Sequence, residues 1–262
     1  MKLKELYESE ERSILTVMGQ QPEKVSRDFS CSYNKLTSLE GCPQEIDGNF
    51  SCSFNKLISL EGGPQKVGKD FDCADNKLTS LEGQPQKVSR DFSCSYNKLT
   101  SLEGAPLEVD RDFYCSHNNL TSLEGGPQKV GKDFDCADNK LTSLEGGPRK
   151  VGRDFICSNN ELINLKGGPQ KVGADFYCIR TKLVNLKDIH KHIKYIGGAA
   201  DFISNSIESH VVGLLLIEGL TKVYLDNKKV ETIINKHLKA NKDVLACIEE
   251  LEEAGYSEFA KI

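Results

Sequence analysis

Ten cysteines are the residues of this chain best suited to chemistry, because thiolates can hold zinc, form disulfides or act as nucleophiles. A zinc site needs ligands around a tetrahedron, whereas evenly spaced thiols in repeats lie along a line. No Cys-x-x-Cys pair occurs. We expect buried, reduced thiols with no metal and no cofactor. Eight of the ten recur every 21 residues: Cys31, Cys52, Cys73, Cys94, Cys115, Cys136, Cys157 and Cys178.

Other residue types that commonly carry catalysis show no catalytic spacing. The chain has no Gly-x-Gly-x-x-Gly, phosphate-binding loop, Gly-x-Ser-x-Gly or His-Glu-x-x-His motif. His190, His192, His210 and His237 have no carboxylate partner at metal-ligand spacing. The sequence therefore predicts a protein that is not an enzyme.

The cysteine spacing belongs to a 21-residue unit that also fixes the positions of all eight prolines, from Pro22 to Pro169. Each unit carries Phe-x-Cys-x-x-Asn-x-Leu-x-x-Leu. A constant period of this length predicts a β-rich solenoid whose turns bury their apolar sides only against their neighbours. We expect one parallel strand per turn at Phe-x-Cys, with Phe and Cys pointing inward and Asn at the following bend. The Gly-Pro return leaves no room for a full outer helix.

These columns resemble leucine-rich repeats, and most closely the compact repeats of bacterial effector proteins. The resemblance covers residues 22 to 189 and implies a surface for binding other proteins. One departure concerns the first apolar residue of the motif, which lies four residues before Phe (Val67 before Phe71) instead of three. The tail, through Leu214–Val230 and Glu249–Lys261, is similar to the end segment of bacteriophage-encoded repeat proteins of mostly undefined function.

Two charged columns precede each Phe. Asp stands directly before Phe in all turns but one, and Lys or Arg stands before the Asp in most, as in Arg90 and Asp91. Rungs of a parallel sheet lie about 4.8 Å apart, so the carboxylates repel one another unless nearby cations offset their charge. We expect a ladder of ion pairs. Calcium between the Asp rungs is the alternative, which the absence of Gly-Gly-x-Gly-x-Asp opposes.

The most varied columns are the outward ones, and they are the candidate site. One lies between Phe and Cys, and the other lies two residues after Cys. Near-copies such as Pro64–Gln84 and Pro127–Gly147 make shared residues less informative than differing ones. Aromatic and Arg side chains are typical of protein interfaces, whereas the interleaved Asp residues disfavour nucleic acid. The predicted partner-binding residues are Tyr96, Tyr114, His117, Tyr177 and Arg180.

The chain divides into an N-terminal cap (1–21), eight repeats (22–189) and a degenerate last turn with a small α/β cap (190–262). The Asn column stops at Thr181, and the last turn is expected to align Phe202 with Phe155. Strands are expected at 211–217 and 223–225, and helices after Asn227 and Asn241. We interpret these elements as closing the open end of the coil; the alternative is an independent activity.

Cys247-Ile-Glu249 distantly resembles the Cys-x-Asp of the ubiquitin-ligase domains found in some bacterial effectors with similar repeats. Its predicted place on the apolar side of a helix makes Cys247 a core residue, since a buried thiol is inert.

Net charge and the lengths of apolar runs limit the kinds of partner and compartment that we expect. The net charge of -5 argues against nucleic acid or an anionic membrane as partner. No apolar run reaches 18 residues, and the charged N-terminus lacks a secretory signal, so we expect a cytoplasmic protein, in the host cytoplasm if phage-encoded. The predicted function is non-catalytic recognition of a protein partner through the strand face. The alternatives are a structural protein that self-associates through an exposed edge, and a small-ligand-binding protein or enzyme.

Overall fold

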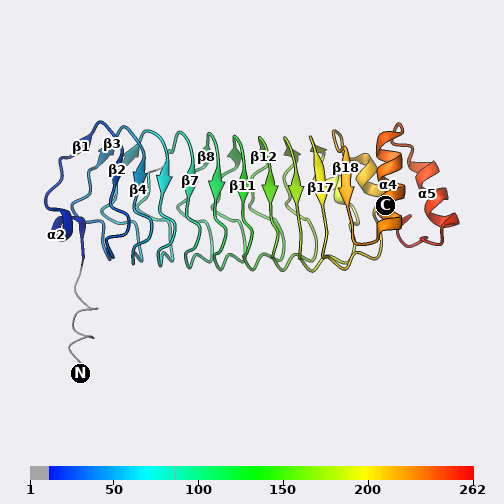
Figure 1. Ribbon diagram of the computed structural model, residues 1–262, viewed down its shortest axis with the longest axis horizontal. Helices are drawn as coiled ribbons and strands as arrows, with labels where there is room; N and C mark the ends of the chain where they lie inside the picture. Colours follow the sequence, from blue (N-terminus) through cyan, green and yellow to red (C-terminus); the bar gives the residue numbers. More distant parts are fainter. Residues whose placement is uncertain (1–11, 86) are drawn as a thin grey trace, which may run out of the picture.

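A computed structural model describes residues 12–85 and 87–262. The chain winds into an elongated coil whose successive turns lie side by side along one axis (Figure 1). The short helix α2 (Ile14–Met18) lies at one end, and helices α4 (Lys228–Lys239) and α5 (Val244–Glu253) lie at the other. Most of the predicted N-terminal cap, residues 1–11, lies outside the described residues.

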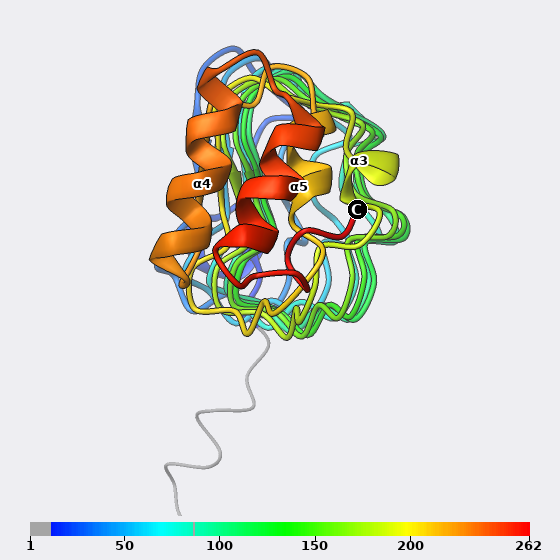
Figure 2. The same cartoon turned by 90° about the vertical axis from the view of Figure 1, so that its right-hand side faces the viewer.

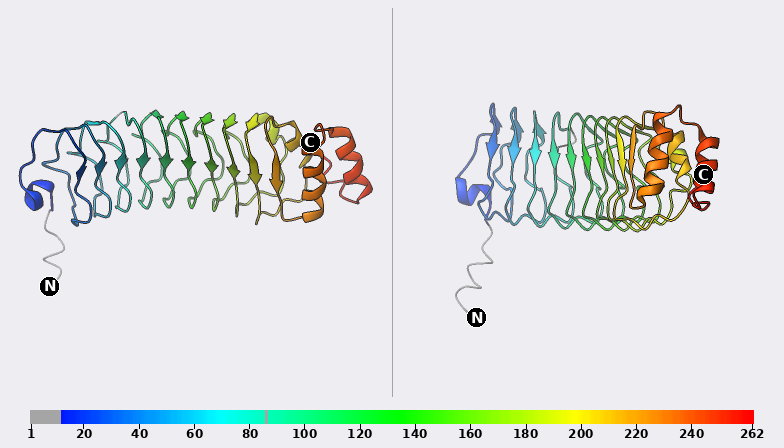
Figure 3. Two further views of the ribbon diagram at one scale, coloured as in Figure 1. Left: turned by 45° about the horizontal axis from the view of Figure 1, so that its top comes forward. Right: turned by 45° about the vertical axis from the view of Figure 1, so that its right-hand side comes forward.

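Each of the eight repeats places a short strand at the predicted Phe position. The strands pair in parallel as one 10-stranded sheet, seen as a row along the coil in Figure 3, and the register joins equivalent residues such as Phe92 and Phe113. This confirms the parallel β-solenoid. The strands are β2 (Phe29–Ser30), β4 (Phe50–Ser51), β6 (Phe71–Asp72), β7 (Phe92–Ser93), β9 (Phe113–Tyr114), β11 (Phe134–Asp135), β13 (Phe155–Ile156), β15 (Phe176–Tyr177), β17 (Ala199–Asp201) and β18 (Lys222–Tyr224).

The turns also contain a second strand, in contrast to the single strand per turn that the repeat pattern predicts. It forms where Val or Ile is buried (half-buried for Val25 in the first turn) and the preceding residue is mostly exposed, as in Lys129 and Val130. Only single bridges through Val88 join the two parts of this second sheet. Its strands are β1 (Lys24–Val25), β3 (Glu45–Ile46), β5 (Lys66–Val67), β8 (Glu108–Val109), β10 (Lys129–Val130), β12 (Lys150–Val151), β14 (Lys171–Val172) and β16 (Tyr195–Ile196).

The core consists of columns that run the length of the coil. Phe92 and Phe113 are fully buried and stack with ring centroids 5.3 Å apart. Cys94 and Cys115 are fully buried beside them, and the Cys94 thiol lies 3.5 Å from the Tyr114 carbonyl oxygen. All ten cysteines are free and buried, which confirms the inward-facing thiol column.

The Asn column joins each turn to the turn before it. Asn118 Nδ2 donates to the carbonyl oxygens of Cys94 and Cys115, both at 3.1 Å, while its Oδ1 accepts the Leu99 N–H at 3.0 Å. These bonds satisfy backbone groups at the bend that neither sheet pairs, which explains why an amide side chain recurs at this position. Within the described residues, no helix lies between Gly19 and Asp188, as the Gly-Pro return predicts.

The last imperfect turn differs from the prediction in its alignment. Phe176 pairs with Ala200, so Phe202 occupies the cysteine column rather than the Phe column. The turn is longer because α3 (Ile189–His192) lies within it. Ala200 and Phe202 exchange the usual large and small positions, and both remain fully buried. The Asn column resumes at Asn205, which donates to the Cys178 carbonyl at 2.7 Å.

The C-terminal end is covered by helices (Figure 2). Residues 211–217, predicted as a strand, instead form the 3₁₀ helix η1 (Val212–Leu216). Asn227 caps α4 as predicted, whereas Asp243 rather than Asn241 caps α5. The edge of β18 meets side chains of α4: Asn235 pairs with both the N–H and the C=O of Val223 at 2.8 Å. Strand pairing with another chain is therefore blocked at this edge.

Candidate functional site

Two outward columns define what we call the strand face. The first column holds the residue between Phe and Cys, and the second holds the residue two after Cys. The first column is Ser30, Ser51, Asp72, Ser93, Tyr114, Asp135, Ile156 and Tyr177, continued in the sheet by Asp201 and Tyr224. The second column is Tyr33, Phe54, Asp75, Tyr96, His117, Asp138, Asn159, Arg180 and Ser204.

Every residue of the second column has a left-handed backbone, with φ between 53° (Asp75) and 60° (Tyr33). The conformation turns the chain inward so that the next residue, which is Asn in all turns but that of Thr181, enters the core. This backbone conformation costs residues other than Gly roughly 1–2 kcal/mol, and Asn and Asp are the residues other than Gly that most often adopt it. Large Tyr, Phe, His and Arg side chains are therefore present at positions where the backbone alone favours small ones.

The aromatic members of the second column stack in pairs on the surface. Tyr33 and Phe54 have ring centroids 4.4 Å apart at 8°, and Tyr96 and His117 have centroids 4.1 Å apart at 14°. Tyr33 is 71% exposed and Tyr96 is 51% exposed. These rings present flat apolar surface with few rotatable bonds, the kind of surface that a partner buries at low entropic cost.

Acidic pairs lie on both sides of the Tyr96–His117 stack. Asp72 and Asp75 belong to the turn before it, and Asp135 and Asp138 to the turn after it. Among the described residues, none of the four forms an ion pair with Lys or Arg; His117 Nε2 lies 3.6 Å from Asp138 Oδ2. Burial and then the charge of Asp72 raise the pKa of Asp75.

The pair at Asp135 and Asp138 has the same electrostatic character. Burial is the largest effect raising the pKa of Asp135, and the charge of Asp138 adds to it. Both pairs thus hold negative charge that the chain leaves without a full counter-charge.

The five predicted residues form two groups rather than one. Tyr96, Tyr114 and His117 lie together in adjacent turns. Burial, and then the negative charge of Asp112, raises the pKa of Tyr114 to about 12. Tyr177 and Arg180 belong to a turn three further along the coil. The Tyr177 hydroxyl donates to Asp175 Oδ2 at 3.0 Å, which anchors this ring to its own rung.

Tyr33 and Phe54 are not among the predicted residues, although they form the most exposed aromatic stack of the second column. The available signal was the occurrence of two aromatic residues at the same repeat position, 21 residues apart. That spacing predicts ring contact across one rung, since neighbouring strands lie about 4.8 Å apart.

The column of Asp residues before Phe is held differently from the prediction. Each carboxylate mainly accepts a backbone N–H from the next turn, as Asp91 Oδ1 does from Asp112 at 3.2 Å. Arginines add longer contacts, such as 3.4 Å between Arg111 Nε and Asp91 Oδ1. Ion pairing is present but secondary. No group of three or more His, Cys, Asp or Glu within 12–85 and 87–262 is placed to hold a metal.

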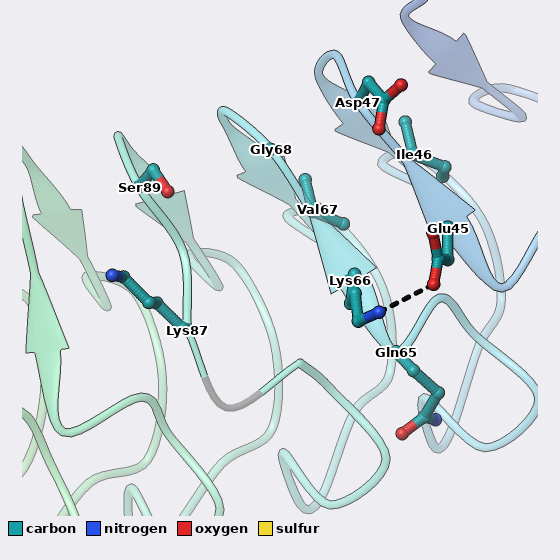
Figure 4. Close-up of a pocket in the computed structure, with 9 residues that line it drawn as sticks. All are labelled: Glu45, Ile46, Asp47, Gln65, Lys66, Val67, Gly68, Lys87 and Ser89. Carbon is teal, nitrogen blue, oxygen red and sulfur yellow. Dashed lines mark hydrogen bonds and ion pairs between the residues drawn. The ribbon is translucent and has the colours of Figure 1, made fainter. Parts of the chain in front are cut away.

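A groove of about 430 Å³ lies on the second sheet near Lys87 and Ser89, where single bridges through Val88 replace a paired strand (Figure 4). Lys66 contacts Glu45 at 2.7 Å, and Lys24 contacts Asp47 at 3.1 Å. Its carboxylates are therefore already paired, in contrast to those of the strand face. None of the helices in the described ranges is long and apolar enough to cross a membrane.

Comparison with known proteins gives matches among solved structures only. No protein-family model matches it, and no curated protein matches it. The functional domain of InlJ from Listeria monocytogenes, which includes a cysteine ladder, is 19% identical with a TM-score of 0.47, covering 87% of this chain and 59% of that chain. YopM from Yersinia enterocolitica is 16% identical with a TM-score of 0.27, covering 76% of this chain and 65% of that one.

The chain thus spans less than two thirds of either protein. Its own 21-residue pattern, parallel strands and buried Asn column make it a leucine-rich-repeat-like repeat protein.

Proposed function

We propose that this protein is a non-catalytic scaffold that recognises another protein through the strand face. The observation that supports this most directly is the presence of exposed aromatic rings at left-handed backbone positions, as in Tyr33 and Tyr96. The backbone favours Asn or Gly there, so folding alone does not explain the rings. Such strain is commonly kept at functional sites.

The alternatives receive less support. Self-association through the last rung conflicts with the edge of β18, which Asn235 already occupies. A thiol enzyme conflicts with Cys247, which is fully buried and whose pKa is raised by that burial to about 11. Ten free thiols fit a reducing compartment such as the cytoplasm. A phage-encoded protein acting on a host factor is the finer form of the proposal, and it rests on the tail resemblance alone.

The test compares the wild type with two matched variants as bait in extracts of the source cells. The face variant carries Tyr33→Asn, Phe54→Asn, Tyr96→Asn and His117→Asn. The control carries Ile58→Thr and Ile163→Thr, which remove two other exposed apolar side chains (63% and 60% exposed) in a column where Thr is usual.

We expect a stoichiometric protein to be retained by the wild type and the control and lost by the face variant. Affinity should fall about thirtyfold or more, equivalent to about 2 kcal/mol. Equal retention by all three proteins would place the site elsewhere on the molecule.

A further inference from the structure

We propose, building on the proposed function, that the strand face selects an extended protein segment carrying two basic side chains four residues apart. One basic group binds at Asp72 and Asp75, the other at Asp135 and Asp138, and the segment crosses the Tyr96–His117 stack between them.

The register of the sheet fixes the distance between the two acidic pairs. Asp72, Ser93, Tyr114 and Asp135 are neighbours in successive strands, so the pairs lie three rungs apart. At about 4.8 Å per rung this distance is about 14 Å. An extended chain rises about 3.3 Å per residue and points alternate side chains to one face, so residues i and i+4 lie about 13 Å apart on the same side. In a helix the same two residues lie only about 6 Å apart.

Charge complementarity identifies the occupant. The four carboxylates have no Lys or Arg partner in the described residues, whereas the carboxylates of the groove on the second sheet are paired. Burial first, and then the neighbouring carboxylate, raises the pKa of Asp75 and of Asp135, and a cation bound beside them would oppose this effect. A polyanion would be repelled at both pairs, and a neutral segment would leave them without a counter-charge.

The aromatic stack adds a second reason for a cation. Asp75, Tyr96, His117 and Asp138 are consecutive members of the second column, and the rings of Tyr96 and His117 face each other. The other face of the Tyr96 ring is therefore directed toward the turn that carries Asp75. A guanidinium or ammonium group placed there contacts a carboxylate and an aromatic face together.

The experiment uses labelled peptides of identical composition and the full chain. The probe is Gly-Arg-Ser-Leu-Ser-Arg-Gly, with its arginines four apart. The comparison peptide is Gly-Arg-Ser-Leu-Arg-Ser-Gly, with the arginines three apart and on opposite faces. Fluorescence anisotropy is measured at about 20 mM and about 150 mM salt, because salt screens contacts that rest on charge alone.

Three variants accompany the wild type. Two are Asp72→Asn/Asp75→Asn and Asp135→Asn/Asp138→Asn; Asn can accept the Ala74 and Ala137 N–H bonds that Asp72 and Asp135 now accept at 3.0 and 2.9 Å. The third is Glu61→Gln/Glu82→Gln, which changes the net charge equally at exposed positions off the strand face. Circular dichroism verifies that each variant is folded.

We expect the first peptide to bind the wild type at least tenfold more tightly than the second, and each Asp variant to weaken it at least tenfold. The Glu variant should bind like the wild type. Equal binding of the two peptides, or equal losses in the Asp and Glu variants, would show that net charge alone attracts them and would overturn the proposal.

The outcome can be separated from that of the proposed function. If the Asp variants retain the captured protein and the aromatic face variant loses it, the basic segment is wrong and the recognition face stands. If the face variant also retains the captured protein, both are wrong.

Discussion

The rings of Tyr96 and His117 stack at 4.1 Å although both residues hold a positive φ, of 57° and 54°. The two residues lie in neighbouring turns. Their side chains therefore come into contact although the backbone at both positions disfavours large side chains. A surface pair of this kind contributes about 0.5–1.5 kcal/mol, which is comparable to the cost of one left-handed residue. The stack therefore offsets only part of the backbone cost at the two positions.

That balance predicts the effect of Tyr96→Asn with His117→Asn on folding. Asn tolerates the left-handed region better than Tyr or His, while the stacking energy is lost. We expect the free energy of unfolding, measured by urea denaturation, to stay within about 1 kcal/mol of the wild type or to rise. A loss above about 2 kcal/mol would mean that the two rings are part of the stabilising structure rather than of a recognition surface.

The Asn column predicts a contrast between two neighbouring residues. Asn118 is 8% exposed, and its side chain bonds Leu99, Cys94 and Cys115. Asn118→Ala leaves these buried backbone groups without partners, at about 1–3 kcal/mol each, and should lower the free energy of unfolding by about 3 kcal/mol or more. Asn119→Ala is the matched control, because only its backbone N–H takes part in a hydrogen bond among the described residues. Similar losses in both variants would contradict the ladder.

The thiol column was predictable because two independent signals agree. Cys recurs every 21 residues, and it stands two residues after a Phe column, so a strand places both on one face. The second strand was not predictable: Lys-Val is too short for alternation to be recognised, and pairing across turns, not local sequence, makes it a strand.

The two outward columns that form the candidate site were predictable from the repeat, but the groups into which their residues assemble were not. Gly or Asn usually indicates a positive φ in a sequence. Here Tyr and His occupy such positions, so the sequence gives no sign of the left-handed backbone. The predicted alignment of Phe202 with Phe155 was wrong because both stand in the same Asp-Phe-Ile context. The observed pairing of Ala200 with Phe176 depends instead on the length of the turn.

Burial of the thiols predicts slow reaction with thiol reagents. All ten cysteines are buried, and Cys94 and Cys115 are fully inaccessible. Titration with a disulfide reagent should modify few groups in the native protein and ten after denaturation. Rapid modification of most thiols in the native protein would contradict the inward-facing column.

The same burial predicts unfolding at alkaline pH. Burial raises the pKa of Cys31 to about 12 and raises the pKa of Cys73 and Cys115 well above the usual range. The folded state therefore keeps these protons above the unfolded thiol pKa of about 8.5, so this stability is complete below that pH and is lost as pH rises. Each shifted thiol removes about 1.4 kcal/mol per pH unit in this range.

With most thiols affected, we expect a cooperative loss of circular dichroism between about pH 9.5 and 11. Return to pH 8 with a reductant present provides the control, since oxidation is then excluded. A protein that stays folded to pH 11.5 would show that the thiols ionise within the fold.

The hydrogen bonds at the edge of the last strand predict what prevents another chain from pairing there. Asn235 pairs with the N–H and C=O of Val223, and Glu231 Oε2 accepts the Leu225 N–H at 2.8 Å. Asn235→Ala with Glu231→Ala leaves these strand groups unpaired and available to another chain. Light scattering after size-exclusion chromatography should then show concentration-dependent oligomers. Lys239→Ala, an exposed change on the same helix, is the control and should stay at the oligomeric state of the wild type. If the double variant keeps the state of the wild type at all concentrations, α4 protects the edge by covering it and the three hydrogen bonds are dispensable.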